Sequence, residues 1–174
     1  MDVLTLSRTY RSTRQITALG ARVASTYNPA ASVVGVDRSG AGVRRLTGGS
    51  LAALTAQAVE EMLRAGHRNV AVVTRRVAEA ERLAEELRYH DLDARPITSE
   101  QARYEGGVVA LPVNLAKGLE FDGAVVVGAD AATYDPATPF ESRLLYVAIS
   151  RGLHALALVA GGELHPLLRA PGEG

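Results

Sequence analysis

The stretch Asn69-Val70-Ala71-Val72-Val73-Thr74 indicates the fold class of this chain. Its four central residues are apolar, and such an unbroken run is typical of a strand buried on both faces of a parallel sheet. Residues 77–90 follow with the pattern of an amphipathic helix, because apolar side chains recur with a period of about 3.6 residues and charges lie mostly opposite them. A buried strand that leads into such a helix predicts one β–α unit of an α/β domain.

Further units of this kind extend towards both ends of the chain. Ser12 and Gln15 are expected to form a capping box on the first helix, Ser50 to cap the second, and Gly66 to end it. Right-handed crossovers would place helices on both faces of a mostly parallel sheet, and ligands of such sheets bind beyond the carboxyl ends of the strands. Short apolar runs predict strands at residues 3–6, 94–97, 108–113, 124–127 and 155–159, and amphipathic patterns predict helices at 12–27, 51–65 and 139–151. Residues 30–47 are mixed, with short apolar runs around 33–34 and 43–46.

Size and composition limit the class of protein. The 174 residues suit one ordinary domain, so a single domain over residues 1–174 is expected. The 19 basic and 19 acidic residues give zero net charge, which does not indicate a protein that coats nucleic acid through bulk charge. The absence of cysteine excludes a disulfide scaffold and a cysteine-type zinc site. No apolar stretch reaches the roughly 20 residues of a membrane helix and no export signal is visible, so a cytoplasmic protein without a membrane partner is expected.

Lys117 is the only lysine of the chain, and the other 18 basic residues are arginines. Coding bias explains the excess of arginine. It does not explain why one lysine stands at this position, which directs attention to its surroundings.

Three clusters of polar residues lie beside predicted strands, the first over residues 7–13. Arg11 offers a guanidinium fork that fits phosphate, and Tyr10 offers a flat face for a base, at a helix start that attracts anions. An ordinary helix start with solvated arginines also explains this cluster.

The second cluster is Ala116-Lys117-Gly118-Leu119-Glu120-Phe121-Asp122, between two predicted strands. Gly118 permits a backbone conformation that a side chain opposes, while Leu119 and Phe121 are expected to enter the core. A polar turn explains everything in this cluster except the lone lysine.

The third cluster is Arg143-Leu144-Leu145-Tyr146-Val147-Ala148-Ile149-Ser150-Arg151. Its leucines, Ala148 and Ile149 form an apolar helix face, and Arg151 ends the helix just before a strand. A core helix with a C-terminal arginine that suits the helix dipole is the ordinary explanation.

Other catalytic motifs are missing from the sequence. No Gly-x-x-x-x-Gly-Lys-Ser/Thr loop is present, so the chain has no Walker A phosphate site of its own. The four histidines have the spacing of neither a metal site nor a catalytic triad, and they are interpreted as structural or surface residues: His67, His90, His154 and His165.

Taken in this order, the three clusters resemble the C-terminal half of a superfamily 1 helicase of the UvrD/Rep/PcrA type, closest to its DNA helicase IV or HelD-like branch. Tyr10-Arg11-Ser12-Thr13 resembles motif IV, residues 112–122 resemble motif V, and residues 143–151 resemble motif VI. Residues 71–87 resemble the segment between motifs IV and V. The resemblance spans nearly the whole chain.

This resemblance implies a RecA-like domain of the P-loop NTPase type, with three α/β/α layers, that is the second half of a two-domain motor. ATP with Mg²⁺ would lie between this domain and an N-terminal RecA-like domain that carries Walker A, Walker B and the metal ligands. Arg11 and Arg151 would be the catalytic arginines that reach the γ-phosphate. Tyr10 would stack near the base, Glu120 would meet the nucleotide, and Lys117 with Gly118 would shape the loop that couples it to a DNA track.

The sequence departs from the family pattern at two points. The family usually has Thr-x-His before motif V, where residues contact single-stranded DNA, but this chain has Pro112 and Asn114. Asn114 can still hydrogen-bond nucleic acid, whereas Pro112 has neither a hydroxyl nor a backbone N–H. The large subdomain inserted between motifs IV and V in UvrD-type enzymes is expected to be absent, or reduced to about residues 30–47.

Three functions therefore remain open. The leading prediction is the C-terminal motor domain of an ATP-dependent DNA helicase or translocase, inactive on its own because half of the ATP site is missing. Its partners would be the N-terminal domain and single-stranded or duplex DNA. The alternative is a HelD-like ATPase domain that acts on RNA polymerase instead of unwinding DNA. The third is a stand-alone binding module that has lost its motor partner. Arginines at positions 8, 14, 44, 45, 75 and 76 are either a track-binding patch or scattered solvated charges.

Overall fold

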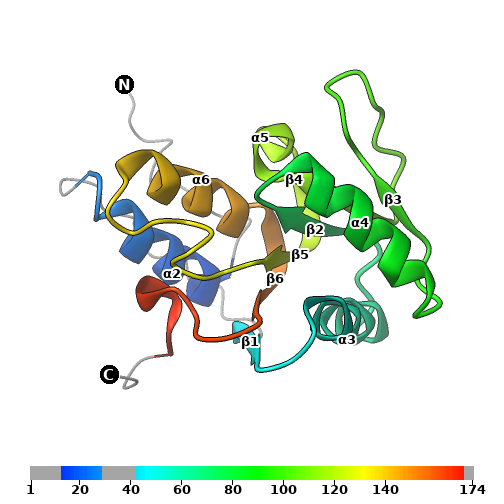
Figure 1. The fold of residues 1–174 in the computed structure, drawn as a ribbon, viewed down its shortest axis with the longest axis horizontal. Coiled ribbons are helices and arrows are strands. Elements are labelled where there is room, and N and C mark those ends of the chain that lie inside the picture. The colour runs from blue at the N-terminus through cyan, green and yellow to red at the C-terminus, as the bar shows by residue number, and fades with distance from the viewer. Residues whose placement is uncertain (1–12, 29–41, 171–174) are drawn as a thin grey trace.

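The computed structural model describes residues 13–28 and 42–170. Over these residues the chain forms a six-stranded sheet, in which every pair of neighbouring strands is parallel, with the order β1-β6-β5-β2-β4-β3 (Figure 1). The strands are β1 (Arg44–Thr47), β2 (Val70–Thr74), β3 (Ala94–Pro96), β4 (Val108–Pro112), β5 (Phe121–Val127) and β6 (Gly152–Ala160). The helices are α2 (Arg14–Ala24), α3 (Leu51–Arg64), α4 (Val77–Arg88), α5 (Val113–Ala116), α6 (Pro139–Ile149) and the 3₁₀ turn η1 (Pro166–Leu168).

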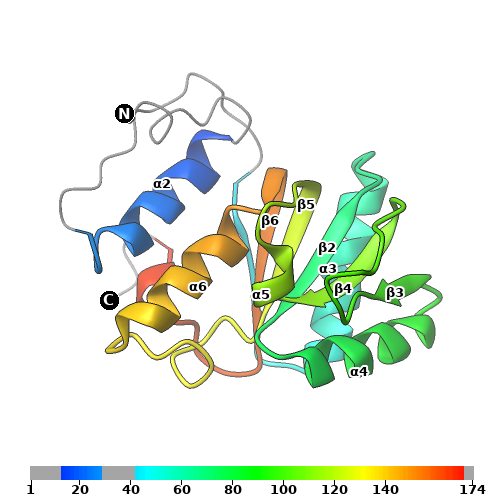
Figure 2. The same cartoon turned by 90° about the horizontal axis from the view of Figure 1, so that it is seen from above.

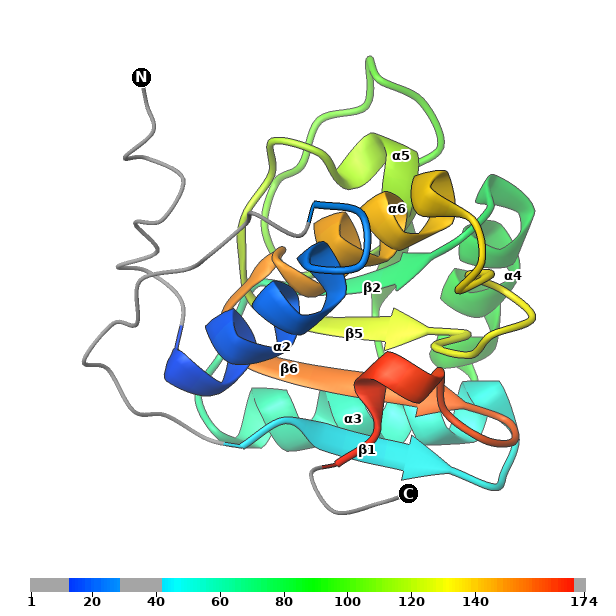
Figure 3. The same cartoon turned by 90° about the vertical axis from the view of Figure 1, so that its left-hand side faces the viewer.

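Helices cover both faces of the sheet, as predicted. Helices α2, α5 and α6 pack on one face, and α3 and α4 pack on the other (Figure 2 and Figure 3). The three-layer α/β architecture expected from the sequence is therefore confirmed. No helix in the described part of the chain is long and apolar enough to cross a bilayer.

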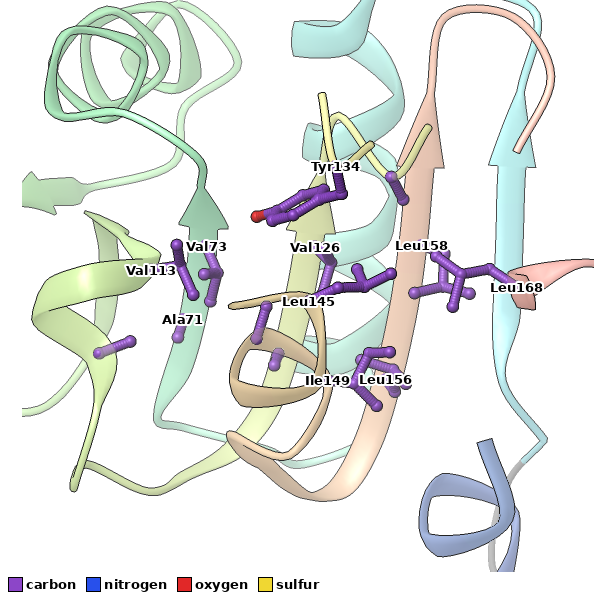
Figure 4. Packing of buried hydrophobic residues seen from close by; sticks show 14 of the residues in the cluster. Ala71, Val73, Val113, Val126, Tyr134, Leu145, Ile149, Leu156, Leu158 and Leu168 are labelled. Atoms are coloured by element: carbon purple, nitrogen blue, oxygen red, sulfur yellow. The ribbon is translucent and has the colours of Figure 1, made fainter. Parts of the chain in front are cut away.

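The core explains why the strands are apolar without interruption. In β2, Ala71 and Val73 belong to the cluster under α6, whereas Val70 and Val72 belong to the cluster under α3 and α4. All five residues of β2 are buried, because consecutive side chains point to opposite faces and both faces are covered. On the α6 side, Leu145 meets the side chains of the central strands (Figure 4).

Helix ends follow local capping chemistry. Thr13 caps α2, because its side-chain oxygen accepts a hydrogen bond from the backbone N–H of Ile16, so the N-cap lies one residue after the predicted Ser12. Ser50 caps α3 as predicted, and Gly66 follows that helix in the left-handed region at φ +99°. Residues 1–12, which include the predicted strand at 3–6, lie outside the described residues.

Candidate functional site

The loop between α5 and β5 carries the residues of the motif V resemblance. Ala116 ends α5, and its carbonyl oxygen accepts a hydrogen bond from the backbone N–H of Leu119 at 3.0 Å, which closes a tight turn. Gly118 lies in this turn at φ +86°, a conformation that favours glycine. Lys117 and Glu120 are exposed on either side of it.

Arg151 is held against this loop. Its guanidinium donates to the carbonyl oxygen of Leu119 at 2.9 Å and to that of Ala116 at 3.5 Å, while its Nε donates to Val147 at 3.0 Å. These acceptors are neutral carbonyl oxygens. Burial lowers the pKa of Arg151, although the charges of Glu120 and Tyr146 act in the opposite direction. The backbone carbonyl of Arg151 also accepts from the N–H of Phe121 at 3.0 Å. Both side-chain and backbone hydrogen bonds of Arg151 therefore connect the motif VI segment to the motif V segment.

These residues lie at the amino ends of the strands. Phe121 begins β5, Gly152 begins β6, and the two residues are register partners. Because Glu120 and Arg151 directly precede these parallel strands, both lie at the amino edge of the sheet. Glu120 and Arg151 therefore do not lie beyond the carboxyl ends of the strands, where ligands of such sheets generally bind.

Residues of the same loop also line a cavity of about 390 Å³. Lys117 and Leu119 line it from the loop, and Asn114 lines it from α5, directly after the carboxyl end of β4. The opposite wall comes from the connection that follows β3, through Ile97, Ser99, Glu100, Ala102 and Tyr104. Sequence reasoning missed this wall, because a polar connection after a short strand has no periodic signal that would indicate a site.

The motif IV residues are only partly within the described structure. Tyr10, Arg11 and Ser12 lie outside the described residues, while Thr13 is the buried cap of α2. Their predicted roles at the nucleotide therefore stay predictions.

The sequence leaves open whether six arginines form one track-binding patch, and the structure places the described ones at different ends of the strands. Arg44 begins β1 and pairs with Glu61 at 2.8 Å, whereas Arg75 follows the carboxyl end of β2 and pairs with Glu141 at 2.8 Å. Arg45 donates to the backbone carbonyl of Leu168 and so holds η1 in place. Five of the six arginines are described. Arg14 begins α2, and the pairs at positions 44–45 and 75–76 lie at opposite ends of their strands and form no continuous patch, while Arg8 lies outside the described residues.

The histidines have no metal-binding arrangement within residues 13–28 and 42–170, since no group of three or more candidate ligands occurs there. His67 and His154 lie nearly parallel with ring centroids 6.0 Å apart, and His165 is fully buried and accepts from the N–H of Leu167. The interpretation of these three side chains as structural or surface residues agrees with these positions.

Comparisons with known proteins relate this arrangement to helicases. Residues 107–159, which contain both the loop and Arg151, match the family model of the UvrD-like helicase C-terminal domain. The fold is similar to the crystal structure of the C-terminal domain of a possible DNA helicase from Lactobacillus plantarum WCFS1, with a TM-score of 0.72 and 29% sequence identity over 92% of each chain. A second similarity, at a TM-score of 0.47 and 11% identity over 87% of this chain and 34% of the other, is to Arterivirus nonstructural protein 10, a helicase, in complex with DNA. No curated protein matches the sequence. The chain thus has the RecA-like fold of a helicase C-terminal domain, and the loop of residues 117–120 and Arg151 lie within the segment that matches the model of the UvrD-like helicase C-terminal domain.

Proposed function

We propose that this chain is the C-terminal RecA-like domain of a UvrD-like, ATP-dependent DNA helicase or translocase, and that it completes an ATP site on an N-terminal RecA-like domain. The observation that carries the proposal is the hydrogen bonding of Arg151 to the loop of residues 116–119, inside the segment that matches the helicase family. The similarity to a helicase C-terminal domain over 92% of both chains supports the same assignment.

Arg151 has the chemistry of an arginine that acts on a phosphoryl group. Its guanidinium is bonded to neutral carbonyl oxygens, which are weaker acceptors than a phosphate. A γ-phosphate on the partner domain would therefore compete well for this group and would be stabilised as its charge spreads in the transition state. Arg11 would be the second such arginine, and Tyr10 would stack near the base, as the resemblance implies.

The loop of residues 117–120 would transmit the nucleotide state. When Arg151 turns towards a phosphate, it gives up the carbonyl oxygens of Ala116 and Leu119. Lys117 and Leu119 of this loop also line the cavity. Loss of the hydrogen bonds from Arg151 would therefore shift residues that form the cavity wall. Glu120, whose charge acts on Arg151, would orient that arginine towards the nucleotide.

The partners of this domain follow from the same proposal. ATP would bind with Mg²⁺, whose ligands belong to the N-terminal domain, and a DNA strand would contact Asn114. The protein would act in the cytoplasm.

The test joins this chain to its N-terminal RecA-like domain, by fusion or by mixing. We expect the combined protein to hydrolyse ATP, this chain alone to be inactive, and Arg151→Ala or Arg11→Ala to reduce the rate by at least about 10³-fold, the lower range for an arginine finger. Arg103→Ala, an exposed arginine outside the three motifs, is the matched control. Unchanged rates in both motif variants would contradict the assigned roles.

One observation favours a second function, a HelD-like ATPase that releases RNA polymerase from nucleic acid. Pro112 is buried and is the register partner of Thr74 in the sheet, so this position offers no side chain or N–H to DNA where the family usually has threonine. A pull-down of the full-length protein with RNA polymerase, beside a strand-separation assay, distinguishes the two functions. Unwinding without polymerase binding would eliminate the second one.

A stand-alone binding module is the third candidate. The reading frame upstream of Met1 is the cheapest test, because a Walker A motif in frame would eliminate this candidate at once.

A further inference from the structure

The cavity beside the loop of residues 117–120 has an aromatic wall that is held in a fixed orientation. Tyr104 lines this cavity, and its ring packs edge-on against Phe121 with centroids 4.9 Å apart and an interplanar angle of 64°. Its hydroxyl donates to the carbonyl oxygen of Gly107 at 3.3 Å. Burial, followed by the nearby charge of Asp122, raises the pKa of Tyr104 to about 12, so the side chain stays a neutral phenol at physiological pH.

The rim of the cavity combines opposite charges with an amide. Lys117 supplies a cation, Glu100 supplies carboxylate acceptors, and Asn114 supplies both a donor and an acceptor. Below them, Leu115 and Leu119 give apolar walls. The volume of about 390 Å³ lies in the usual range for small-ligand sites.

A single nucleobase matches this combination better than other ligands. A purely apolar ligand would gain no interaction with the exposed charges of Lys117 and Glu100, and a free inorganic anion would be opposed by Glu100. A base, by contrast, stacks on an aromatic face, while its polar edge exchanges hydrogen bonds with amide and carboxylate groups. Its phosphate carries the charge that Lys117 would bind.

We infer that this cavity holds one unstacked base of the nucleic-acid strand, and that it prefers bases with an exocyclic amino group. Tyr104 is the stacking platform, Asn114 and Glu100 bind the edge of the base, and Lys117 binds the adjoining phosphate. The preference arises because the Glu100 carboxylate accepts from an amino group, as acidic side chains do from cytosine N4, whereas thymine carries a carbonyl oxygen at the same ring position. This inference rests on the proposed function, since it concerns the strand on which the motor acts.

Fluorescence anisotropy with labelled dC and dT strands of equal length, at one salt concentration, tests the inference on the full chain. These two bases are similar in size and differ in the group that Glu100 would meet. We expect dC to bind more tightly than dT by about tenfold, and Glu100→Gln to reduce the difference to less than about twofold. Glu105→Gln, another exposed glutamate of the same connection, should leave the difference unchanged.

Tyr104→Leu tests the stacking platform. We expect it to weaken binding of dC by about tenfold, within the range measured for loss of one base–aromatic stack. Tyr89→Leu is the matched control, because Tyr89 is 82% exposed and does not line the cavity. Circular dichroism shows whether Tyr104→Leu still folds, and Glu100→Gln tests the inference independently because that residue is exposed.

Equal binding of dC and dT that neither cavity variant changes would overturn the inference and leave the motor assignment standing. A loss in Tyr89→Leu as large as that in Tyr104→Leu would also overturn it. Failure of every strand to bind would overturn this inference together with DNA contact by this domain. The ATPase test with Arg151→Ala separately decides the role of the domain in the motor.

Discussion

Gly118 holds the turn between Lys117 and Leu119 in a left-handed conformation, at φ +86°. A β-carbon at this position would meet no atom within 4 Å, so the cost of a substitution comes from the backbone conformation alone. We expect Gly118→Ala to lower the free energy of unfolding by about 1 kcal/mol in urea titrations. Gly118→Asn should cost less, because asparagine tolerates this region. Equal stability of the Ala variant and the wild type would show that the turn relaxes without glycine.

Asp122 makes the stability of the fold depend on pH, and the direction of this dependence follows from its hydrogen bonds. Its carboxylate accepts hydrogen bonds from the backbone N–H groups of Asn69 and Arg68, both at 3.1 Å, and these bonds lower the pKa of Asp122 in the folded protein, Asn69 most strongly. The stabilisation is therefore present above the pKa of the unfolded chain, about 3.9, and is lost as pH falls through the lower folded pKa.

We predict that the stability of the wild type decreases below about pH 4 more steeply than that of Asp122→Asn, whose amide does not titrate. Thermal unfolding across this range measures the difference, and Asp93→Asn, at an exposed aspartate, is the control. Parallel curves for the wild type and Asp122→Asn would contradict the role of these two hydrogen bonds.

Lys117 illustrates what a single residue can predict. As the only lysine, it directed attention to the loop that the structure places against Arg151 and beside the cavity. A compact ammonium and a planar guanidinium differ in shape, so a tight loop can accept the first and reject the second. Normal ATPase activity in a Lys117→Arg variant of the joined protein would remove this hypothesis.

At the scale of elements, long patterns were predictable and short ones were not. The apolar run at residues 70–73 and the amphipathic helix that follows are confirmed, and all five residues of β2 are buried. Helix α5 was missed, because its four residues are too few for a helical period to be recognised. In α3, Leu63 is 37% exposed whereas Val59 is fully buried, so an apolar residue type does not by itself place a side chain on the buried face.

The pairing of β5 with β6 depends on Gly152, directly after Arg151. A β-carbon there would lie 2.5 Å from the backbone oxygen of Ala155 and 3.0 Å from the backbone nitrogen of Ala124. Because both neighbours are backbone atoms, they cannot move aside by changing rotamer. We expect Gly152→Ala to destabilise the fold by about 1–3 kcal/mol, the range for overpacking.

Gly162→Ala is the matched control for that variant, because its β-carbon would have no neighbour within 4 Å. Chemical unfolding of both proteins measures the contrast. Equal stabilities would mean that the amino ends of β5 and β6 adjust more easily than their backbone contacts suggest.

At the scale of the whole molecule, the sequence predicted the layers but not the placement of the site. Alternating strands and helices implied a parallel sheet covered on both faces, which the structure confirms. The strand order could not be predicted, because residues as distant as Arg44 and Ala157 become partners only through long-range pairing. For the same reason, the position of Glu120 and Arg151 at the amino edge, and the cavity with Tyr104, emerge only in three dimensions.

The central claim is that Arg151 stabilises the transition state of ATP hydrolysis on a partner domain. In the protein that contains both RecA-like domains, the affinities for ADP and for ADP–aluminium fluoride separate ground-state from transition-state binding. We predict that Arg151→Ala weakens binding of ADP–aluminium fluoride by at least about 100-fold and binding of ADP by less than about threefold, whereas Arg103→Ala, at an exposed arginine outside the three motifs, changes neither. Equal losses for the two ligands, or no loss for either, would contradict the account.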